Sequence, residues 1–296
     1  MSERKLGVAI VGCGFMGRRH LLGFAALHKA GVLKGEVVAL LDINKEVADK
    51  VADEAFELLG IAGSYEAIEV ESGGLAEFLK SQGADYDYFS LTMPLKEVCI
   101  DYLDLVEPVA RQITSVNTIV FKSGGGNGFS TDLLAFKNLL SPYFGKEIAI
   151  LGAGGTARAA LGALKGTNTK VKILTRSSSR HSKMIEAASD TDIAFVDWND
   201  FSSIQNSNLI ISTTPKGSTD SFVVNESNAD LFEVLYHPWP TKLVENYQRL
   251  GKQVIGGLSL LVEQALFQIQ KFSEEDFDFD VMRTKLLKVA EQTANK

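Results

Sequence analysis

The chain has 296 residues, of which 45% are hydrophobic and 23% are charged, and its formal net charge is −7. These values are ordinary for a globular protein of two domains or one large α/β unit, and the negative charge argues against a nucleic acid partner. The two cysteines, Cys13 and Cys99, provide neither a disulfide framework nor a metal-binding spacing, and no apolar run has the length of a signal-peptide core or a membrane span, so we expect a cytoplasmic protein without a metal site.

Short apolar runs alternate with helical patterns along the chain. We expect strands at residues 7–11, 37–41, 67–70, 88–91, 148–151, 170–174, 193–196, 208–212, 233–236 and 253–255. We expect helices at residues 20–28, 47–59 and 75–81, after Gly155, and over most of the C-terminal segment. The turn-rich segment 122–128 is expected to be a hinge or a hairpin tip. The alternation predicts an α/β fold with mostly parallel sheets that helices cover on both faces.

The first expected strand runs into a glycine-rich turn. Gly12, Gly14 and Gly17 have the G-x-G-x-x-G spacing, and Asp42 follows the next expected strand, 25 residues after the last glycine. One interpretation is a second NAD site in which Asp42 accepts from the ribose hydroxyls, and the other is a βαβ unit whose glycines only permit tight packing. Residues 1–58 resemble the amino-terminal βαβ unit of the glucose–fructose oxidoreductase and inositol dehydrogenase superfamily.

A second glycine-rich turn lies in the middle of the chain, between an apolar strand and a helix. Its residues are Gly152, Ala153, Gly154, Gly155 and Thr156. Such a turn lets backbone N–H groups approach a pyrophosphate. The next expected strand ends in Thr175, Arg176 and Ser177, with Arg180 close behind, where a dinucleotide-binding fold reads the adenosine ribose. A cation and hydroxyls suit a 2′-phosphate, so the pattern predicts an oxidoreductase that uses NADP.

Five further segments carry polar residues in a distinctive order. They are residues 90–97, 115–118, 128–132, 235–241 and 256–265. Together with the turn at 152–159 and the strand end at 175–177, this set resembles the shikimate dehydrogenase family from about residue 61 to the C-terminus. The resemblance implies two α/β domains, namely a discontinuous substrate domain and a Rossmann-type, doubly wound NADP domain. It places the substrate domain at residues 1–131 and 258–296 and the NADP domain at residues 132–257.

The resemblance also implies roles for single residues. Lys96 and Asp132 match the catalytic pair of the family. A lysine ammonium can stabilise a developing alkoxide and deliver a proton, while a nearby aspartate positions it. The positions that match substrate-binding residues are Thr92, Asn117, Asp132, Tyr236 and Gln264. In the cofactor site, Thr213 begins a loop near the nicotinamide ribose, and Gly257 joins the same set.

The implied reaction is the reversible NADPH-dependent reduction of 3-dehydroshikimate to shikimate. Three family asparagines are replaced by Ser90, Ser130 and Thr175, and the S-x-S-P-x-x-H-N motif that holds the substrate carboxylate is missing. Two alternatives therefore stay open. The enzyme acts on a related acid such as quinate, or the chain is a non-catalytic NADP-binding sensor.

A substitute for the missing serines is available near the N-terminus. Arg18 and Arg19 lie in the first turn of the helix expected after Gly17, and an arginine fork binds a carboxylate through two hydrogen bonds. The alternative is that both arginines are solvated. The partner we expect is thus a small cyclic hydroxy acid rather than a nucleic acid or a membrane, and the chain is expected to be a monomer or a homodimer.

Overall fold

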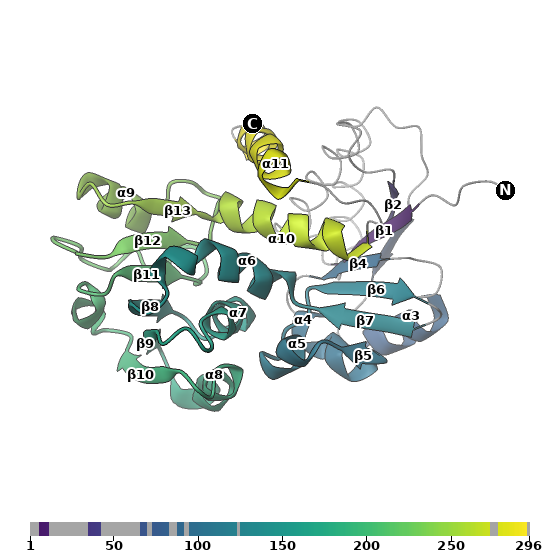
Figure 1. The fold of residues 1–296 in the computed structure, drawn as a ribbon, viewed down its shortest axis with the longest axis horizontal. Coiled ribbons are helices and arrows are strands. Elements are labelled where there is room, and N and C mark those ends of the chain that lie inside the picture. Colours follow the sequence, from purple (N-terminus) through teal and green to yellow (C-terminus); the bar gives the residue numbers. More distant parts are fainter. Residues whose placement is uncertain are drawn as a thin grey trace. The chain divides into compact units, whose positions relative to one another are not determined.

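The computed structural model describes residues 6–11, 35–42, 66–69, 73–82, 88–91, 95–122, 125–272 and 278–294. The chain divides into two compact units, labelled by element in Figure 1. The first unit contains Met1–Arg111, Ser115–Thr131 and Ala265–Lys296, and the second contains Gln112–Thr114 and Asp132–Gln264. Each unit is built around its own β-sheet.

The described part of the first unit has a seven-stranded mixed sheet in the order β3-β2-β1-β4-β6-β7-β5. Its strands are β1 (Leu6–Val11), β2 (Gly35–Asp42), β3 (Glu66–Glu69), β4 (Tyr88–Leu91), β5 (Leu105–Val106), β6 (Thr118–Lys122) and β7 (Gly125–Phe129). The strands β3, β2, β1 and β4 are mutually parallel, whereas β6 is antiparallel to both β4 and β7. Residues 122–128 were expected to be a hinge or hairpin tip, and of these Lys122 and Gly125 are partners in the antiparallel β6–β7 pairing.

Short helices and the C-terminal part of the chain complete the first unit. They are α3 (Leu75–Gln82), α4 (Leu95–Val98), α5 (Pro108–Gln112), α11 (Phe279–Ala294) and the second half of α10 (Gly257–Phe272), which the division crosses after Gln264. Buried apolar side chains from α3, β4 and β6 form one core, which includes Leu75, Phe89 and Ile119. Phe89 also meets the ring of Phe121 edge to face, with centroids 5.2 Å apart.

The second unit has a six-stranded sheet in which every pairing is parallel. Its strands are β8 (Glu147–Leu151), β9 (Lys170–Thr175), β10 (Asp192–Asp197), β11 (Leu209–Ser212), β12 (Asp230–Glu233) and β13 (Val254–Gly256). Their order is β10-β9-β8-β11-β12-β13. Counted from β8, this is the order 3-2-1-4-5-6 of a doubly wound dinucleotide-binding fold. The predicted α/β class with a parallel, doubly wound sheet is therefore confirmed.

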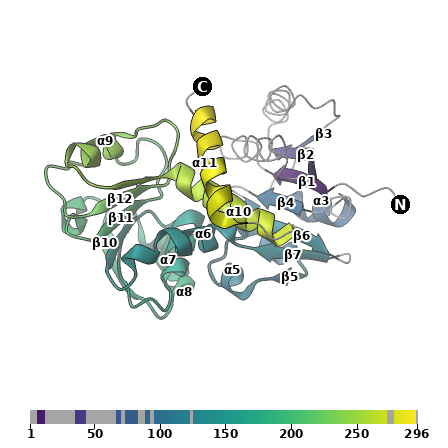
Figure 2. The same ribbon diagram turned by 45° about the horizontal axis from the view of Figure 1, so that its top comes forward.

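Helices cover both faces of this parallel sheet. The helices α6 (Thr131–Leu139), α7 (Gly155–Ala163) and α8 (His181–Ala187) lie on one side, and α9 (Lys242–Arg249) lies on the other (Figure 2). Phe136 of α6 packs on Phe232 of β12 with ring centroids 5.5 Å apart, while Leu231 belongs to the core that includes α9. Burial on both faces explains why the strands read as continuous apolar runs.

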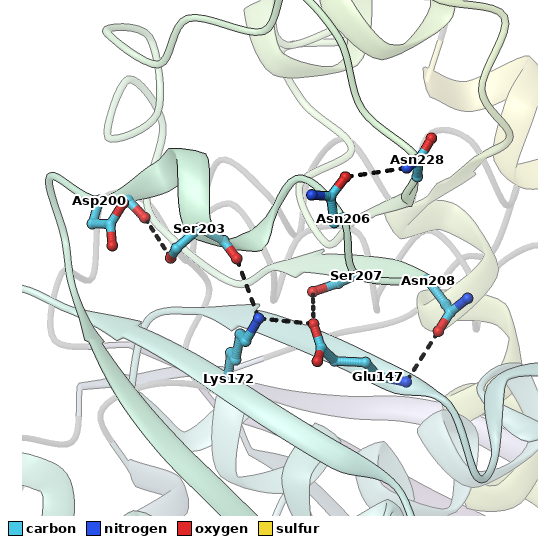
Figure 3. A network of polar contacts seen from close by, with 8 residues as sticks. All are labelled: Glu147, Lys172, Asp200, Ser203, Asn206, Ser207, Asn208 and Asn228. Atoms are coloured by element: carbon cyan, nitrogen blue, oxygen red, sulfur yellow. Dashed lines mark hydrogen bonds and ion pairs between the residues drawn. The ribbon is translucent and has the colours of Figure 1, made fainter.

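A polar network ties the start of β8 to its neighbours (Figure 3). The carboxylate of Glu147 pairs with Lys172 of β9 at 2.9 Å and accepts from Ser207 at 3.0 Å. The backbone N–H of Glu147 donates to Asn208 Oδ1 at 3.1 Å. These contacts lie at the amino ends of the strands. Parallel sheets bind ligands at the carboxyl ends of their strands, so this network lies away from the expected ligand site.

Most expected strands agree with the observed ones to within a residue or two, but one is misplaced. The strand expected at 233–236 is observed as Asp230–Glu233. The apolar run of residues 234–236 lies beyond the sheet, because the carboxylate of Glu233 accepts from Leu235 N at 3.1 Å and turns the chain there. The helices expected at 20–28 and 47–59 lie outside the described residues, as do Gly12, Gly14 and Gly17.

Candidate functional site

The backbone of the turn after β8 requires a glycine at position 152. Gly152 has φ +102°, and a Cβ added there would lie 2.9 Å from Thr213 Oγ1. Gly152 N donates to Leu174 O at 3.0 Å, and Thr213 Oγ1 donates to Leu151 O at 2.8 Å. Thr213, expected at the cofactor, therefore packs directly against the turn, and only glycine fits at position 152.

The helix that follows the turn presents its amino end without a side-chain cap. Gly154 is the N-cap residue of α7 and, having no side chain, makes no cap hydrogen bond to the first-turn N–H groups. Uncapped N–H groups at the start of a helix bind anions well. Ala153, Gly155 and Thr156 complete this turn and are partly exposed. The arrangement fits a pyrophosphate.

Three of the four residues expected at the adenosine ribose are exposed. Arg176, Ser177 and Arg180 lie on the surface after β9, and Arg180 Nη1 is 3.7 Å from the position of a Cβ on Gly154. Arg180 thus lies over the glycine turn. Thr175 differs because it is nearly buried, and its hydroxyl bonds His181 Nε2 at 2.9 Å. The two arginines supply the positive charge that a 2′-phosphate requires, so the residues present fit NADP.

In the first unit, a buried polar cluster surrounds Asn117. Asn117 Nδ2 donates to Thr131 Oγ1 at 2.8 Å, and Asn117 Oδ1 accepts from Thr131 N at 2.7 Å. These paired bonds fasten the 115–118 segment to the start of α6, where Asp132 is the next residue. Asp132 is itself only 7% exposed. The local sequence Ser130-Thr131-Asp132 therefore sets the start of α6 through contacts made by Asn117.

Lys96 lies on α4, a single turn that follows β4. Its carbonyl accepts from Val116 N at 2.8 Å, so α4 is held beside the segment that leads through Asn117 into β6. The backbone N–H of Leu91 also donates to Asn117 O at 2.9 Å. Backbone hydrogen bonds of residues 116 and 117 therefore connect the segment that contains Asn117 to β4 and to the helix that carries Lys96. Thr92, Arg18 and Arg19 lie outside the described residues.

Gln268 of α10 joins the cluster around Asn117, although no motif singled it out. Its Nε2 donates to Ser90 Oγ at 3.3 Å and to Thr118 Oγ1 at 3.2 Å. All three side chains are buried. Thr118 in turn contacts Thr131 Oγ1 at 3.2 Å. Gln268 could have been identified from its four-residue spacing to Gln264, which places both glutamines on one face of a helix.

Tyr236 and Gly257 follow the carboxyl ends of β12 and β13, and Gln264 lies on α10. Tyr236 and Gln264 are buried, and Gln264 Nε2 donates to Leu261 O of its own helix at 3.1 Å. A Cβ on Gly257 would lie 2.0 Å from Val234 O, so only glycine lets α10 begin against the chain leaving β12. Close backbone approach is therefore the physical reason for this glycine.

Glu233 is a buried carboxyl that the sequence pattern did not single out as functional. It lies at the carboxyl end of β12, where it accepts from Leu235 N at 3.1 Å and from Thr241 Oγ1 at 3.2 Å. Thr241 also caps α9 by accepting from Val244 N at 3.2 Å. Burial raises the pKa of Glu233 to about 7. One carboxyl thus orders both ends of the loop that carries Tyr236.

A family model described as the shikimate dehydrogenase substrate binding domain matches residues 34–119. The shikimate dehydrogenase (NADP(+)) of Pyrobaculum aerophilum is 33% identical over 217 residues, which cover 71% of this chain and 81% of that protein. The crystal structure of shikimate 5-dehydrogenase from Thermus thermophilus in complex with NADP(H) and shikimate aligns with a TM-score of 0.70 at 24% identity, covering 96% of this chain and 99% of that one. Quinate dehydrogenase from Corynebacterium glutamicum in complex with NAD also aligns with a TM-score of 0.70, at 19% identity over 96% and 99% of the two chains.

Proposed function

The chain belongs to the shikimate dehydrogenase family, and we propose on that premise that it catalyses the reversible NADP-dependent reduction of 3-dehydroshikimate to shikimate. One observation carries the proposal: a dinucleotide turn flanked by arginines and a buried polar segment around Asn117 occur in the same chain as Lys96 and Asp132. A non-catalytic sensor would need only the first of these features. Their joint presence favours an enzyme.

The second unit would hold the cofactor. The turn from Gly152 to Thr156 would bind the pyrophosphate, and Arg176, Ser177 and Arg180 would bind the 2′-phosphate of the adenosine ribose. Thr213, Gly257 and the hydroxyl of Thr175 belong to the same proposed site, Thr175 acting indirectly because it bonds His181. When bound, the nicotinamide supplies or accepts the hydride.

Lys96 and Asp132 would carry out the proton transfer that accompanies reduction of the ketone. As the ketone is reduced, its oxygen becomes a developing alkoxide that must gain one proton. The Lys96 ammonium is suited to stabilise that charge and to deliver the proton, and Asp132 is suited to position the ammonium and to bind a ring hydroxyl. In the reverse direction the neutral amine would take the proton back. Net charge and proton number balance in both directions.

The remaining substrate contacts are proposed from the same family pattern. Asn117 would bind a ring hydroxyl, and Thr92, Tyr236 and Gln264 would line the pocket. The rigid pairing of Asn117 with Thr131 supports this role, because a preorganised amide loses little entropy when it binds a hydroxyl. The first unit would then serve as the substrate domain, near residues 1–131 and 258–296, and the second as the NADP domain, near residues 132–257.

The substrate carboxylate needs a different anchor in this chain, because the family's two-serine motif is missing. We propose Arg18 and Arg19 for that role. Replacing both by alanine should raise KM far more than it lowers kcat, since the contact is shared by the ground state and the transition state. Unchanged KM for the acid would assign the anchor elsewhere and leave both arginines as solvated residues.

Quinate is the second candidate substrate, because the rewritten anchor bears on substrate choice and because a quinate dehydrogenase shares the fold. An absorbance assay at the NADPH band with shikimate and with quinate separates the two. We expect NADP-dependent oxidation of shikimate at the higher kcat/KM. A higher kcat/KM with quinate would identify quinate as the substrate. Tight NADPH binding without turnover of either acid would support the non-catalytic sensor.

Three further properties belong to the proposal. We propose a cytoplasmic enzyme that works as a monomer or a homodimer and binds no nucleic acid, in line with the net charge of −7. No described helix is long and apolar enough to cross a membrane. Light scattering during gel filtration would give the mass of the assembly, and a mass above that of a dimer would contradict the proposed assembly.

A further inference from the structure

The register of the second sheet places Arg176 and Trp198 side by side at the carboxyl ends of β9 and β10. Thr175 ends β9 and Asp197 ends β10, and these two residues are partners in the parallel ladder. Arg176 therefore directly follows β9, and Trp198 directly follows β10. The Cζ atom of Arg176 lies over the indole of Trp198, 5.9 Å from its centroid, which is within the range of a cation–π interaction.

The indole of Trp198 is itself held by the core. It packs on Phe222 with ring centroids 5.0 Å apart, and Phe222 stacks on Phe201 at 4.3 Å. Phe201 and Phe222 are both buried. Trp198 is therefore the outer end of a fixed aromatic stack, whereas Arg176 is exposed. A stack of this kind can restrict a long side chain that would otherwise sample many rotamers.

The second arginine of the loop lies near the strand on the opposite side of β9. Arg180 Nη1 lies 3.7 Å from the Cβ position of Gly154, which follows β8, and β9 lies between β8 and β10 in the sheet. Arg176 thus contacts Trp198 on the β10 side, and Arg180 lies on the β8 side. A guanidinium that rests its face on a ring keeps its N–H edge for an anion, so both arginines can bind one phosphate placed between them.

We propose that Trp198 is a positioning residue that sets the preference for NADP over NAD by holding the guanidinium of Arg176 for the 2′-phosphate. The inference rests on the proposed function, because it assumes that this edge binds the adenosine ribose. Trp198 need not touch the nucleotide. Its contribution is to order Arg176 before the nucleotide arrives, which lowers the entropic cost of binding the phosphate.

Calorimetric titration of the full chain with NADPH, NADH and adenosine 2′,5′-bisphosphate tests the inference. We expect Trp198→Leu to weaken binding of NADPH and of the bisphosphate about 2- to 5-fold and to leave NADH unchanged. Trp198→Phe keeps the stack on Phe222 with a weaker ring face, so its effect should be smaller. Equal losses for NADPH and NADH would show a merely structural role and overturn the inference.

A double-mutant cycle identifies the partner of Trp198. In an Arg176→Ala background, Trp198→Leu should cause no further loss of NADPH affinity, whereas in an Arg180→Ala background it should keep its full effect. Full effect in both backgrounds would overturn the inference. If the unchanged chain binds neither NADPH nor the bisphosphate, the proposed function falls as well. If it binds both and Trp198→Leu changes neither, only the role of Trp198 falls.

Discussion

Two glutamates of the second unit illustrate how the surroundings of a single residue set its pKa. Burial raises the pKa of Glu233 to about 7, although hydrogen bonds from Leu235 N and from hydroxyls oppose that shift. Glu147 is partly exposed, and its hydrogen bond with Lys172 holds the pKa of that carboxyl below its usual range. The two groups therefore affect stability over different ranges of pH.

The first prediction concerns Glu233→Gln. Because the folded-state pKa of about 7 lies above the ordinary value of 4.5, folding favours the protonated acid, and its contribution to stability is lost as pH rises from about 4.5 through 7. Glutamine imitates the protonated acid at every pH. The variant should match the native chain at pH 5 and be more stable at pH 8, by up to about 3 kcal/mol.

Thermal or urea unfolding at both pH values measures this difference, and Glu147→Gln is the matched control. The pKa of Glu147 is lowered by Lys172, so its contribution is present above the ordinary pKa and is lost only in more acidic solution. The control should therefore lose about 0.5 kcal/mol equally at pH 5 and pH 8. If Glu233→Gln also gives a constant difference, the carboxyl is ionised throughout and the raised pKa is wrong.

The second prediction concerns the proposed proton-transfer pair. Lys96→Ala and Asp132→Ala should each lower kcat by about 10² or more, because each removes a group that acts on the developing alkoxide. NADPH affinity should be retained in both variants. Lys80 lies exposed near the end of α3, so Lys80→Ala should leave kcat unchanged. A Lys96→Ala enzyme with nearly normal kcat would remove the proton-transfer role from Lys96.

At the scale of elements, sequence patterns predicted most of the second sheet because each of its strands is a short apolar run followed by a turn. A hairpin tip was one expectation for residues 122–128, but the strands β6 and β7 were not predicted, and β7 reads Gly-Gly-Asn-Gly-Phe, which contains few residues that favour strands. The strand β12 was misplaced because its apolar run continues beyond the sheet. Gln268 was missed for another reason: its partner Ser90 lies 178 residues away in the chain. Glu233 was missed because its burial and its contacts depend on how the chain turns after β12.

The third prediction concerns the contact of α10 with β4 and β6. Gln268→Leu removes the donor that Ser90 and Thr118 share, which leaves two buried hydroxyls with fewer partners and should cost about 1–3 kcal/mol of stability. Because Thr118 contacts Thr131, the loss should also raise KM for the acid substrate. Gln270 is exposed on the same helix, so Gln270→Leu serves as the control.

Unfolding and steady-state kinetics together distinguish the outcomes for α10. A large loss of stability with unchanged KM would limit Gln268 to a structural role. Restoration of KM by Gln268→Asn, which keeps a shorter amide, would support the link to Asn117 and Thr131. A loss of stability in Gln270→Leu as large as that in Gln268→Leu would instead point to a general effect on the helix.

At the scale of the whole molecule, the sequence contains two glycine fingerprints, but the described residues form one complete doubly wound sheet. In the first unit the order β3-β2-β1-β4 follows the 3-2-1-4 pattern of such a fold. The strand order departs from that of a doubly wound sheet after β4, because β6 is antiparallel to β4 where a further parallel strand would be required. The described strands of the first unit therefore match one mononucleotide-binding half and do not continue into a second.

The last prediction follows from that difference: the chain should bind one nucleotide. A dinucleotide lies across both halves of a doubly wound sheet, so a single half at β1 and β2 offers no place for the nicotinamide mononucleotide. Calorimetry should give one NADPH per chain, and NAD added at saturating NADPH should release no further heat. Asp42 ends β2, and Asp42→Ala should leave the stoichiometry unchanged. Two sites per chain, one of them lost in Asp42→Ala, would make the first fingerprint a working NAD site and would contradict a purely structural role for its glycines.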